Sequence, residues 1–239
     1  MRIGLFDSGV GGLNVLKEFI KKYPNNTYYY YGDTKNVPYG DKDKETLLKL
    51  STNIIRFFEQ KQVDLIVIAC GTISASCYNE LKKITNIKII DIITPVISYL
   101  TSLKEKNISV FATKRTIESH IFKNNLKEKE VLEVATLEFV PMIESFKIDT
   151  NIIKNYVNLI KNTEVLVLGF THYPLLETEI KKYLTKDILI INMGVVLVSS
   201  TELKNNSLPS VNLYFTKIDD SLKKNIDLIL TCDYKLELA

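Results

Sequence analysis

The stretch that decides the fold is Arg2-Ile3-Gly4-Leu5-Phe6-Asp7-Ser8-Gly9-Val10-Gly11-Gly12-Leu13. An apolar run, Arg2–Phe6, leads into an acid and a glycine-rich turn, and the amphipathic segment Leu13–Lys22 follows at once. Strand, tight turn and helix in this order make the first part of a βαβ unit. The stretch therefore predicts an α/β fold with parallel strands.

The same alternation runs along the rest of the chain. Continuous apolar runs of about four to eight residues are typical of strands that are buried on both faces. The predicted strands are Arg2–Phe6, Thr27–Tyr31, Asp64–Ala69, Lys88–Ile93, Ile108–Ala112, Leu132–Phe139, Glu164–Leu168 and Asp187–Ile191. The predicted helices are Leu13–Lys22, Lys44–Gln60, Ser74–Ile84, Ser119–Glu128, Ile153–Asn162, Leu175–Tyr183 and Ser221–Leu230.

The order of the predicted elements repeats in the second half of the chain. Cys70 and Phe170 end corresponding strands, and Asp7 and Thr113 begin corresponding turns. The repeat predicts two pseudo-symmetric lobes, each a mostly parallel sheet flanked by helices. We expect residues 1–95 plus 209–239 to form the first lobe and residues 96–208 to form the second. Because ligands bind beyond the carboxyl ends of parallel strands, the active site is expected in the cleft between the lobes.

Composition and charge argue against several classes of protein. The 239 residues include 31 basic and 28 acidic side chains, a net charge of +3 that gives no support to nucleic-acid binding. Three cysteines without CxxC spacing and two histidines argue against a disulfide framework, a structural zinc site or a multi-histidine metal site. No apolar run approaches the ~18 residues that span a membrane, and the N-terminus lacks the pattern of a signal peptide. We expect a cytoplasmic protein without a metal ion, a membrane or a nucleic acid as partner.

Four side chains can carry chemistry, and each has a structural alternative. Asp7, at the glycine-rich turn, can orient an ammonium group or assist proton transfer, but such a turn also serves close helix packing. Cys70 precedes a predicted helix, where the helix dipole favours the thiolate; the alternative is an inert buried cysteine. His172 is a catalyst or a turn-packing residue, and Glu144 is an acid of the site or a solvated surface residue.

Five motifs, taken together, resemble the glutamate racemases of the aspartate/glutamate racemase superfamily. They occur in that family's order and at about its spacing, over most of the chain. The motifs are Phe6-Asp7-Ser8-Gly9-Val10-Gly11-Gly12-Leu13; Tyr31-Gly32-Asp33-Thr34 with Val37-Pro38-Tyr39-Gly40; Ala69-Cys70 with Thr72; Ala112-Thr113-Lys114 with Thr116; and Leu168-Gly169 with Thr171-His172-Tyr173-Pro174-Leu175-Leu176.

The resemblance implies a cofactor-independent enzyme that interconverts L- and D-glutamate for peptidoglycan precursors, and it implies a homodimer. Two thiols would work on opposite faces of the α-carbon, one removing a proton and the other delivering one. The resemblance assigns the first thiol to Cys70, with Asp7, His172 and Glu144 as assisting groups. The substrate-binding residues that it implies are Asp7, Ser8, Pro38, Tyr39, Gly40, Gly71, Thr72, Thr113, Thr116, Phe170, Thr171 and His172.

Two positions depart from the family's pattern. The family has Cys-Asn-Thr where this chain has Cys70-Gly71-Thr72, and Gly-Cys-Thr-His where this chain has Gly169-Phe170-Thr171-His172. Phe170 thus stands where the second thiol is expected, and loss of one acid–base group costs about 10²–10⁴-fold in rate. Three hypotheses follow. His172 replaces the second thiol; or the enzyme performs one-base chemistry such as decarboxylation, or acts on another acidic amino acid; or the protein binds its ligand without catalysis.

Overall fold

Two parallel sheets form the frame of the computed structural model, which describes residues 1–144, 147–172, 176–204 and 208–239, and only the main chain of Glu144. The first sheet has the strand order β10–β9–β2–β1–β3–β4, and the second has the order β6–β5–β7–β8. The strands of the first are β1 (Arg2–Asp7), β2 (Thr27–Gly32), β3 (Leu65–Ile68), β4 (Lys88–Asp91), β9 (Ser210–Phe215) and β10 (Lys235–Leu238). Those of the second are β5 (Asn107–Ala112), β6 (Glu130–Ala135), β7 (Val165–Leu168) and β8 (Leu189–Asn192).

The internal repeat is visible in the topology. The order β2–β1–β3–β4 in the first sheet matches the order β6–β5–β7–β8 in the second, and all of these pairings are parallel. The central strands β3 and β7 are buried along their whole length, because helices cover both faces of a parallel sheet. The predicted fold class, two parallel sheets flanked by helices, is confirmed.

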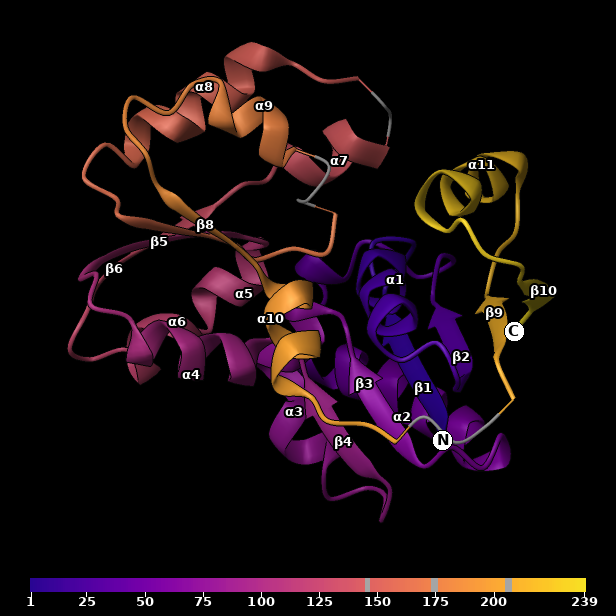
Figure 1. The fold of residues 1–239 in the computed structure, drawn as a ribbon. Helices are drawn as coiled ribbons and strands as arrows, with labels where there is room; N and C mark the ends of the chain where they lie inside the picture. Colours follow the sequence, from indigo (N-terminus) through magenta and orange to yellow (C-terminus); the bar gives the residue numbers. More distant parts are fainter. Residues whose placement is uncertain (145–146, 173–175, 205–207) are drawn as a thin grey trace.

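Helices surround and connect the two sheets (Figure 1). Behind the first sheet, α2 and α3 enclose one apolar core, and behind the second, α7, α8 and α9 enclose another. A third core is shared: α10 packs against both α1 and α4, and its buried side chains belong to an apolar cluster that includes strands of both sheets. The helices are α1 (Leu13–Lys22), α2 (Lys44–Gln60), α3 (Gly71–Leu81), α4 (Ile93–Ser102), α5 (Lys114–Glu118), α6 (Ile121–Asn125), α7 (Phe139–Glu144), α8 (Thr150–Leu159), α9 (Glu177–Lys181), α10 (Met193–Ser200) and α11 (Asp220–Ile229).

Several predicted elements were wrong or missed. The predicted strand Leu132–Phe139 lies at Glu130–Ala135 instead, and Phe139 begins α7. The predicted helix Ser119–Glu128 is replaced by α5 and α6, because His120 adopts a left-handed conformation with φ 51° between them. Helices α4 and α10 were missed for different reasons. The predicted strand Lys88–Ile93 ran into the start of α4, whereas α10 is mostly apolar and lacks a polar face of regular period.

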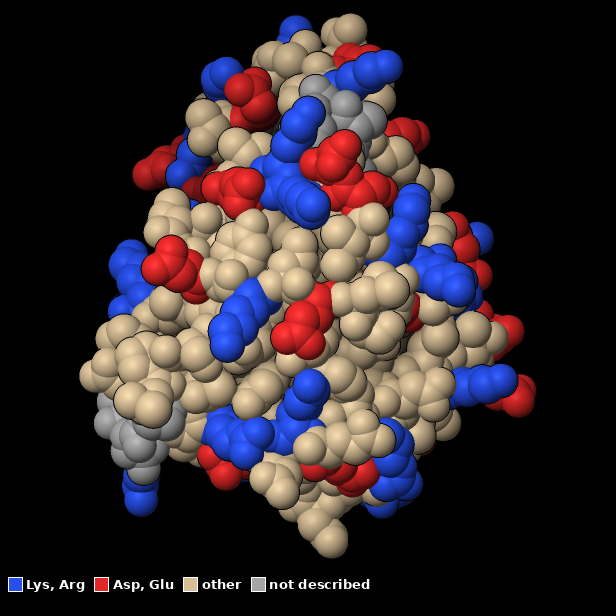
Figure 2. All heavy atoms as spheres, turned by 90° about the vertical axis from the view of Figure 1, so that its right-hand side faces the viewer, with Lys and Arg blue, Asp and Glu red and all other residues tan. Residues whose placement is uncertain are grey.

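The C-terminal segment adds two strands to the edge of the first sheet. Strand β9 pairs with β2 and β10 pairs with β9, although the sequence predicted only a helix in this segment. Lys235 and Glu237 are exposed on the edge strand β10, and charged residues on an edge discourage pairing with other chains. On this face of the molecule, basic and acidic side chains lie interspersed (Figure 2).

Replacing Leu213 by alanine should measure how strongly β9 belongs to the fold. Leu213 is fully buried in the shared core and pairs with Tyr30, so we expect a loss of about 2–5 kcal/mol in the free energy of unfolding. Urea denaturation checks this value. The matched control is Leu238→Ala on β10, where the side chain is 68% exposed and little change is expected. Equal midpoints for the two variants would show that β9 contributes little to stability.

No helix among the described residues is long and apolar enough to cross a membrane.

Candidate functional site

The carboxyl ends of β3 and β7 meet in the interior of the molecule. Cys70 is the N-cap residue of α3 and is buried, and Gly71 follows as the first residue of that helix. A Cβ on Gly71 would lie 3.0 Å from the carbonyl oxygen of Gly169, the residue before Phe170. Because a side chain at position 71 would crowd this carbonyl, the glycine allows the two strand ends to approach closely.

The glycine-rich turn after β1 makes a second close approach to the end of β7. A Cβ on Gly11 would lie 2.3 Å from Oγ1 of Thr171 and 2.4 Å from Nδ1 of His172. Only glycine leaves room here for the imidazole ring. Thr171 and His172 thus pack directly against the turn between β1 and α1.

Asp7 occupies the centre of this arrangement. Its carboxylate is buried, and Oδ2 accepts hydrogen bonds from the main-chain N–H groups of Gly9 (3.3 Å) and Gly12 (3.0 Å). The hydroxyl of Thr171 donates to the same oxygen at 3.5 Å. These hydrogen bonds fix the carboxylate of Asp7 between the glycine-rich turn and the end of β7.

The thiol of Cys70 keeps its proton at neutral pH in this structure. Burial raises the pKa of the Cys70 thiol to about 12, and the negative charge of Asp7 adds to the effect. The main-chain N–H groups of Ile73, Ser8 and Thr72 act in the opposite direction, because they donate to the sulfur. The lower thiol pKa expected from the helix N-terminus is therefore outweighed by removal of the thiol from water.

The imidazole of His172 is neutral in the same environment. Burial lowers the pKa of His172 below its usual 6.5, while the charge of Asp7 partly offsets the shift. The ring of Phe170 stacks on the imidazole with a centroid separation of 4.9 Å and an interplanar angle of 16°. Phe170 also belongs to the core behind the second sheet, so its ring orients His172 from that side.

Three threonine hydroxyls form a chain that joins the two sheets. Oγ1 of Thr72, on α3, lies 3.0 Å from Oγ1 of Thr113, which follows β5. Thr113 in turn lies 3.0 Å from Oγ1 of Thr116 and is the N-cap residue of α5. Gly40 lies on the same side, since a Cβ on it would be 3.4 Å from Cβ of Thr113. These hydroxyls offer donors and acceptors for the carboxylates of a small polar ligand.

Tyr39 is held near this cluster by Asp33, a buried acid that the resemblance does not place among the site residues. Its hydroxyl donates to Oδ2 of Asp33 at 2.6 Å, and both residues are buried. Pro38, by contrast, is exposed. Asp33 directly follows β2, and Asp7 is the last residue of β1, so its place after an apolar run was the signal that could have identified Asp33.

Not every predicted site residue can be placed. The side chain of Glu144 lies outside the described residues, as do Tyr173, Pro174 and Leu175 of the last motif. The cluster described above therefore consists of Cys70, Gly71, Thr72, Asp7, Ser8, Tyr39, Gly40, Thr113, Thr116, Phe170, Thr171 and His172.

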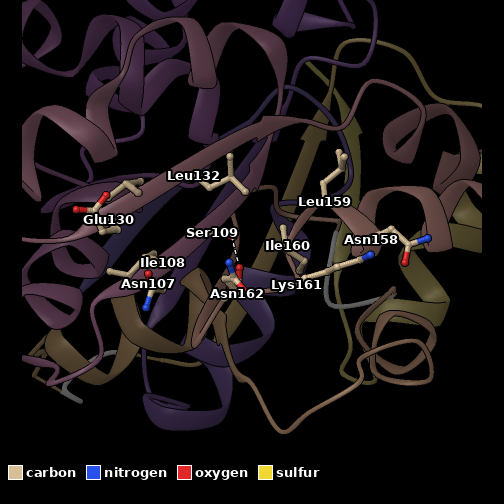
Figure 3. Close-up of a pocket in the computed structure, with 12 residues that line it drawn as sticks. Asn107, Ile108, Ser109, Glu130, Leu132, Asn158, Leu159, Ile160, Lys161 and Asn162 are labelled. Atoms are coloured by element: carbon tan, nitrogen blue, oxygen red, sulfur yellow. Dashed lines mark hydrogen bonds between the residues drawn. The ribbon is translucent and has the colours of Figure 1, made fainter.

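The centre of the cluster is buried, whereas Gly40 and Thr113 are partly exposed. Cys70, Thr72, Thr116, Thr171 and His172 are each at most 5% exposed. An open pocket of about 330 Å³ lies instead at the amino ends of the second sheet's strands, beside Asn107 and Glu130 (Figure 3). Ligands of parallel sheets bind at the opposite, carboxyl ends, so this pocket is a poor candidate for the active site.

Acidic, cysteine and histidine side chains are too dispersed for a metal centre in the described part of the chain. No group of three or more such residues there could hold a metal ion.

Comparison with known proteins gives a consistent result. The model of the family described as Asp/Glu/Hydantoin racemase matches residues 14–203. The glutamate racemase of Aquifex pyrophilus is 37% identical over 249 residues, covering 100% of this chain and 98% of that protein. The glutamate racemase of Fusobacterium nucleatum is 40% identical over 223 residues, covering 89% of this chain and 83% of that protein.

Solved structures agree with the sequences. The Aquifex pyrophilus glutamate racemase superposes with a TM-score of 0.89 at 36% identity, covering 100% of this chain and 98% of the other. The Francisella tularensis glutamate racemase, solved in complex with D-glutamate, superposes with a TM-score of 0.88 at 29% identity, covering 100% and 97% of the two chains. The chain belongs to the Asp/Glu/Hydantoin racemase family.

Proposed function

We propose that this protein is a cofactor-independent glutamate racemase that supplies D-glutamate for peptidoglycan precursors. The observation that carries the proposal is that equivalent strand ends of two related sheets bring Cys70 and His172 to one buried cluster around Asp7. The glutamate racemases to which the chain is similar over nearly its whole length support the choice of substrate.

Cys70 and His172 are the proposed pair of acid–base groups. Inversion of a carbon centre requires one group to remove the α-proton and another to deliver a proton to the opposite face. A neutral imidazole can accept the α-proton while the protonated thiol of Cys70 donates its own, which leaves an imidazolium and a thiolate. The reverse reaction starts from that second form, and proton exchange with solvent returns the first. One proton is removed from the α-carbon and one is delivered, so no co-reactant is needed.

The surroundings of Cys70 suit the charge that develops during this exchange. The N–H groups of Ser8, Thr72 and Ile73 stabilise the thiolate once the proton has left. Asp7 stabilises the imidazolium of His172, because an opposite charge nearby favours the charged form. The hydroxyls of Thr72 and Thr113, with that of Thr116, are the proposed ligands of the substrate carboxylates. A closed site excludes water and strengthens each of these interactions.

Restoring a thiol at position 170 should raise the rate. With Phe170→Cys, a second thiol would stand beside His172 on the second sheet, and we expect racemisation to increase by about tenfold or more, since an acid–base group is worth about 10²–10⁴-fold. Phe170→Ala is the matched control, because it removes the same ring without adding a thiol. Circular dichroism of glutamate solutions measures both. If the two variants turn over at the same rate, a thiol at position 170 does not act in proton transfer, and the pocket has been remodelled beyond this one residue.

Exchange of the α-proton separates the proposed function from its alternatives. The purified protein is incubated in deuterated water with L- and D-glutamate and with both enantiomers of aspartate. The α-deuterium content and the optical rotation are then followed together. Inversion of glutamate accompanied by exchange is the expected result. Exchange without inversion would indicate one-base chemistry. Inversion of aspartate but not of glutamate would indicate another substrate. Absence of exchange with every substrate would indicate a binding protein.

The proposal extends to the movement of the lobes, the oligomeric state and the cellular compartment. We propose that residues 1–95 plus 209–239 and residues 96–208 move apart as lobes to admit substrate, which the burial of the site supports. A homodimer is also proposed, supported by the exposed apolar side chains of Tyr99, Leu189 and Val195 around a pocket on α4, β8 and α10. Three free cysteines fit a reducing cytoplasm.

A further inference from the structure

Asn14 makes a direct connection between the two halves of the molecule at the site. It lies in the first turn of α1, where its side-chain amide donates one hydrogen bond to the carbonyl oxygen of Gly11 (3.1 Å) and another to that of Thr171 (3.0 Å). The carbonyl oxygen of Gly11 also accepts a hydrogen bond from the main-chain N–H of Asn14 at 3.0 Å, so this contact is local. The hydrogen bond to Thr171 is the one that links segments distant in the chain. A side-chain amide of this length supplies two N–H donors, whereas a carboxylate or an alkyl group supplies none.

The carbonyl that Asn14 holds belongs to the residue immediately before His172. Because the peptide bond is planar, fixing the carbonyl of Thr171 also fixes the main-chain nitrogen from which His172 extends. On the other side, Thr171 Oγ1 donates to Asp7 at 3.5 Å and the imidazole rests against Gly11. The Thr171–His172 segment is thus held at its carbonyl by Asn14 and at its hydroxyl by Asp7.

We propose that Asn14 is a positioning residue for racemisation, whose amide keeps His172 over Gly11 and beside Asp7. The inference rests on the proposed role of His172 in proton transfer. Asn14 itself makes no contact with the reacting atoms in this scheme. Its effect depends on orientation, and a displacement of about 1 Å at a catalytic group can cost about 10²-fold in rate.

The test compares Asn14→Leu with the matched control Asn155→Leu, on the exposed face of α8. Asn14→Leu removes both donors without adding charge, and Asn14→Asp, which keeps the size, is the second variant. We expect kcat/KM to fall by about 10- to 100-fold in both Asn14 variants and by less than about twofold in the control. Primary isotope effects are measured with α-deuterated L- and D-glutamate. The effect should rise only for the enantiomer that His172 deprotonates.

A double-mutant cycle separates failure of this inference from failure of the proposed function. In the His172→Asn background, Asn14→Leu should cost less than about twofold, because residues that act through one another are not additive. An equal cost in both backgrounds, or isotope effects that stay unchanged for both enantiomers, would overturn the positioning role and leave that of His172 intact. Full activity of His172→Asn alone would overturn both.

Discussion

Racemisation of glutamate should fall by about 10²–10⁴-fold when Cys70 is replaced by alanine. Cys70 is the only cysteine at a carboxyl strand end within the cluster around Asp7, and its thiol is the proposed proton donor to one face of the α-carbon. Alanine keeps the start of α3 and removes only the sulfur, so the loss reports proton transfer. The value of kcat/KM is measured with both enantiomers, and it should fall by the same factor in both directions, since the equilibrium between enantiomers is unchanged.

The control for this change is Cys77→Ala. Cys77 lies on the same helix, is fully buried in the core behind the first sheet, and also has a pKa raised to about 11 by burial. Its replacement should lower stability but leave the rate constant of folded protein close to that of the unchanged chain. If Cys70→Ala were as active as Cys77→Ala, the proposed two-base mechanism would be wrong at its first group.

Replacing His172 by asparagine should produce a loss of similar size, about 10²–10⁴-fold, because no second thiol stands on that side of the site. The variant should also change the pH profile of kcat/KM. His172 must be neutral to accept the α-proton, and its pKa is lowered below the usual 6.5. The unchanged protein should therefore keep its activity through neutral pH and lose it only when the pH falls below the pKa of His172. The asparagine variant should lack this acidic limb.

His120→Asn is the matched control for His172→Asn. His120 is exposed, and its left-handed conformation suits asparagine, so folding and rate should change little. Retention of the acidic limb in His172→Asn would show that another group accepts the proton. A loss of rate shared by both histidine variants would point to a general effect on the fold.

Local pattern was enough to predict the architecture and much of the candidate site. Helices α1 and α2 lie where their amphipathic period placed them, and the buried runs became the central strands of two parallel sheets. The strand-end residues Asp7, Cys70 and His172 were selected because parallel strands present their carboxyl ends at one edge. Their roles in catalysis stay predictions.

Helices α4 and α10 show where local pattern fails. Each packs one side against the core that the two sheets share, and that packing exists only in the folded molecule. The same holds for β9, which becomes a strand by pairing with β2, a segment more than 180 residues earlier in the chain.

The sequence by itself determined that this chain forms α/β units with an acid, a thiol and an imidazole at strand ends. Only the tertiary structure decided their chemistry. Removal from water raises the pKa of Cys70 and lowers that of His172. At Cys70 this effect is larger than the opposite effect of the helix N-terminus, which favours the thiolate. It also decided that Asn14 reaches Thr171 across the site, because a hydrogen bond between residues 157 positions apart depends on how the two sheets pack.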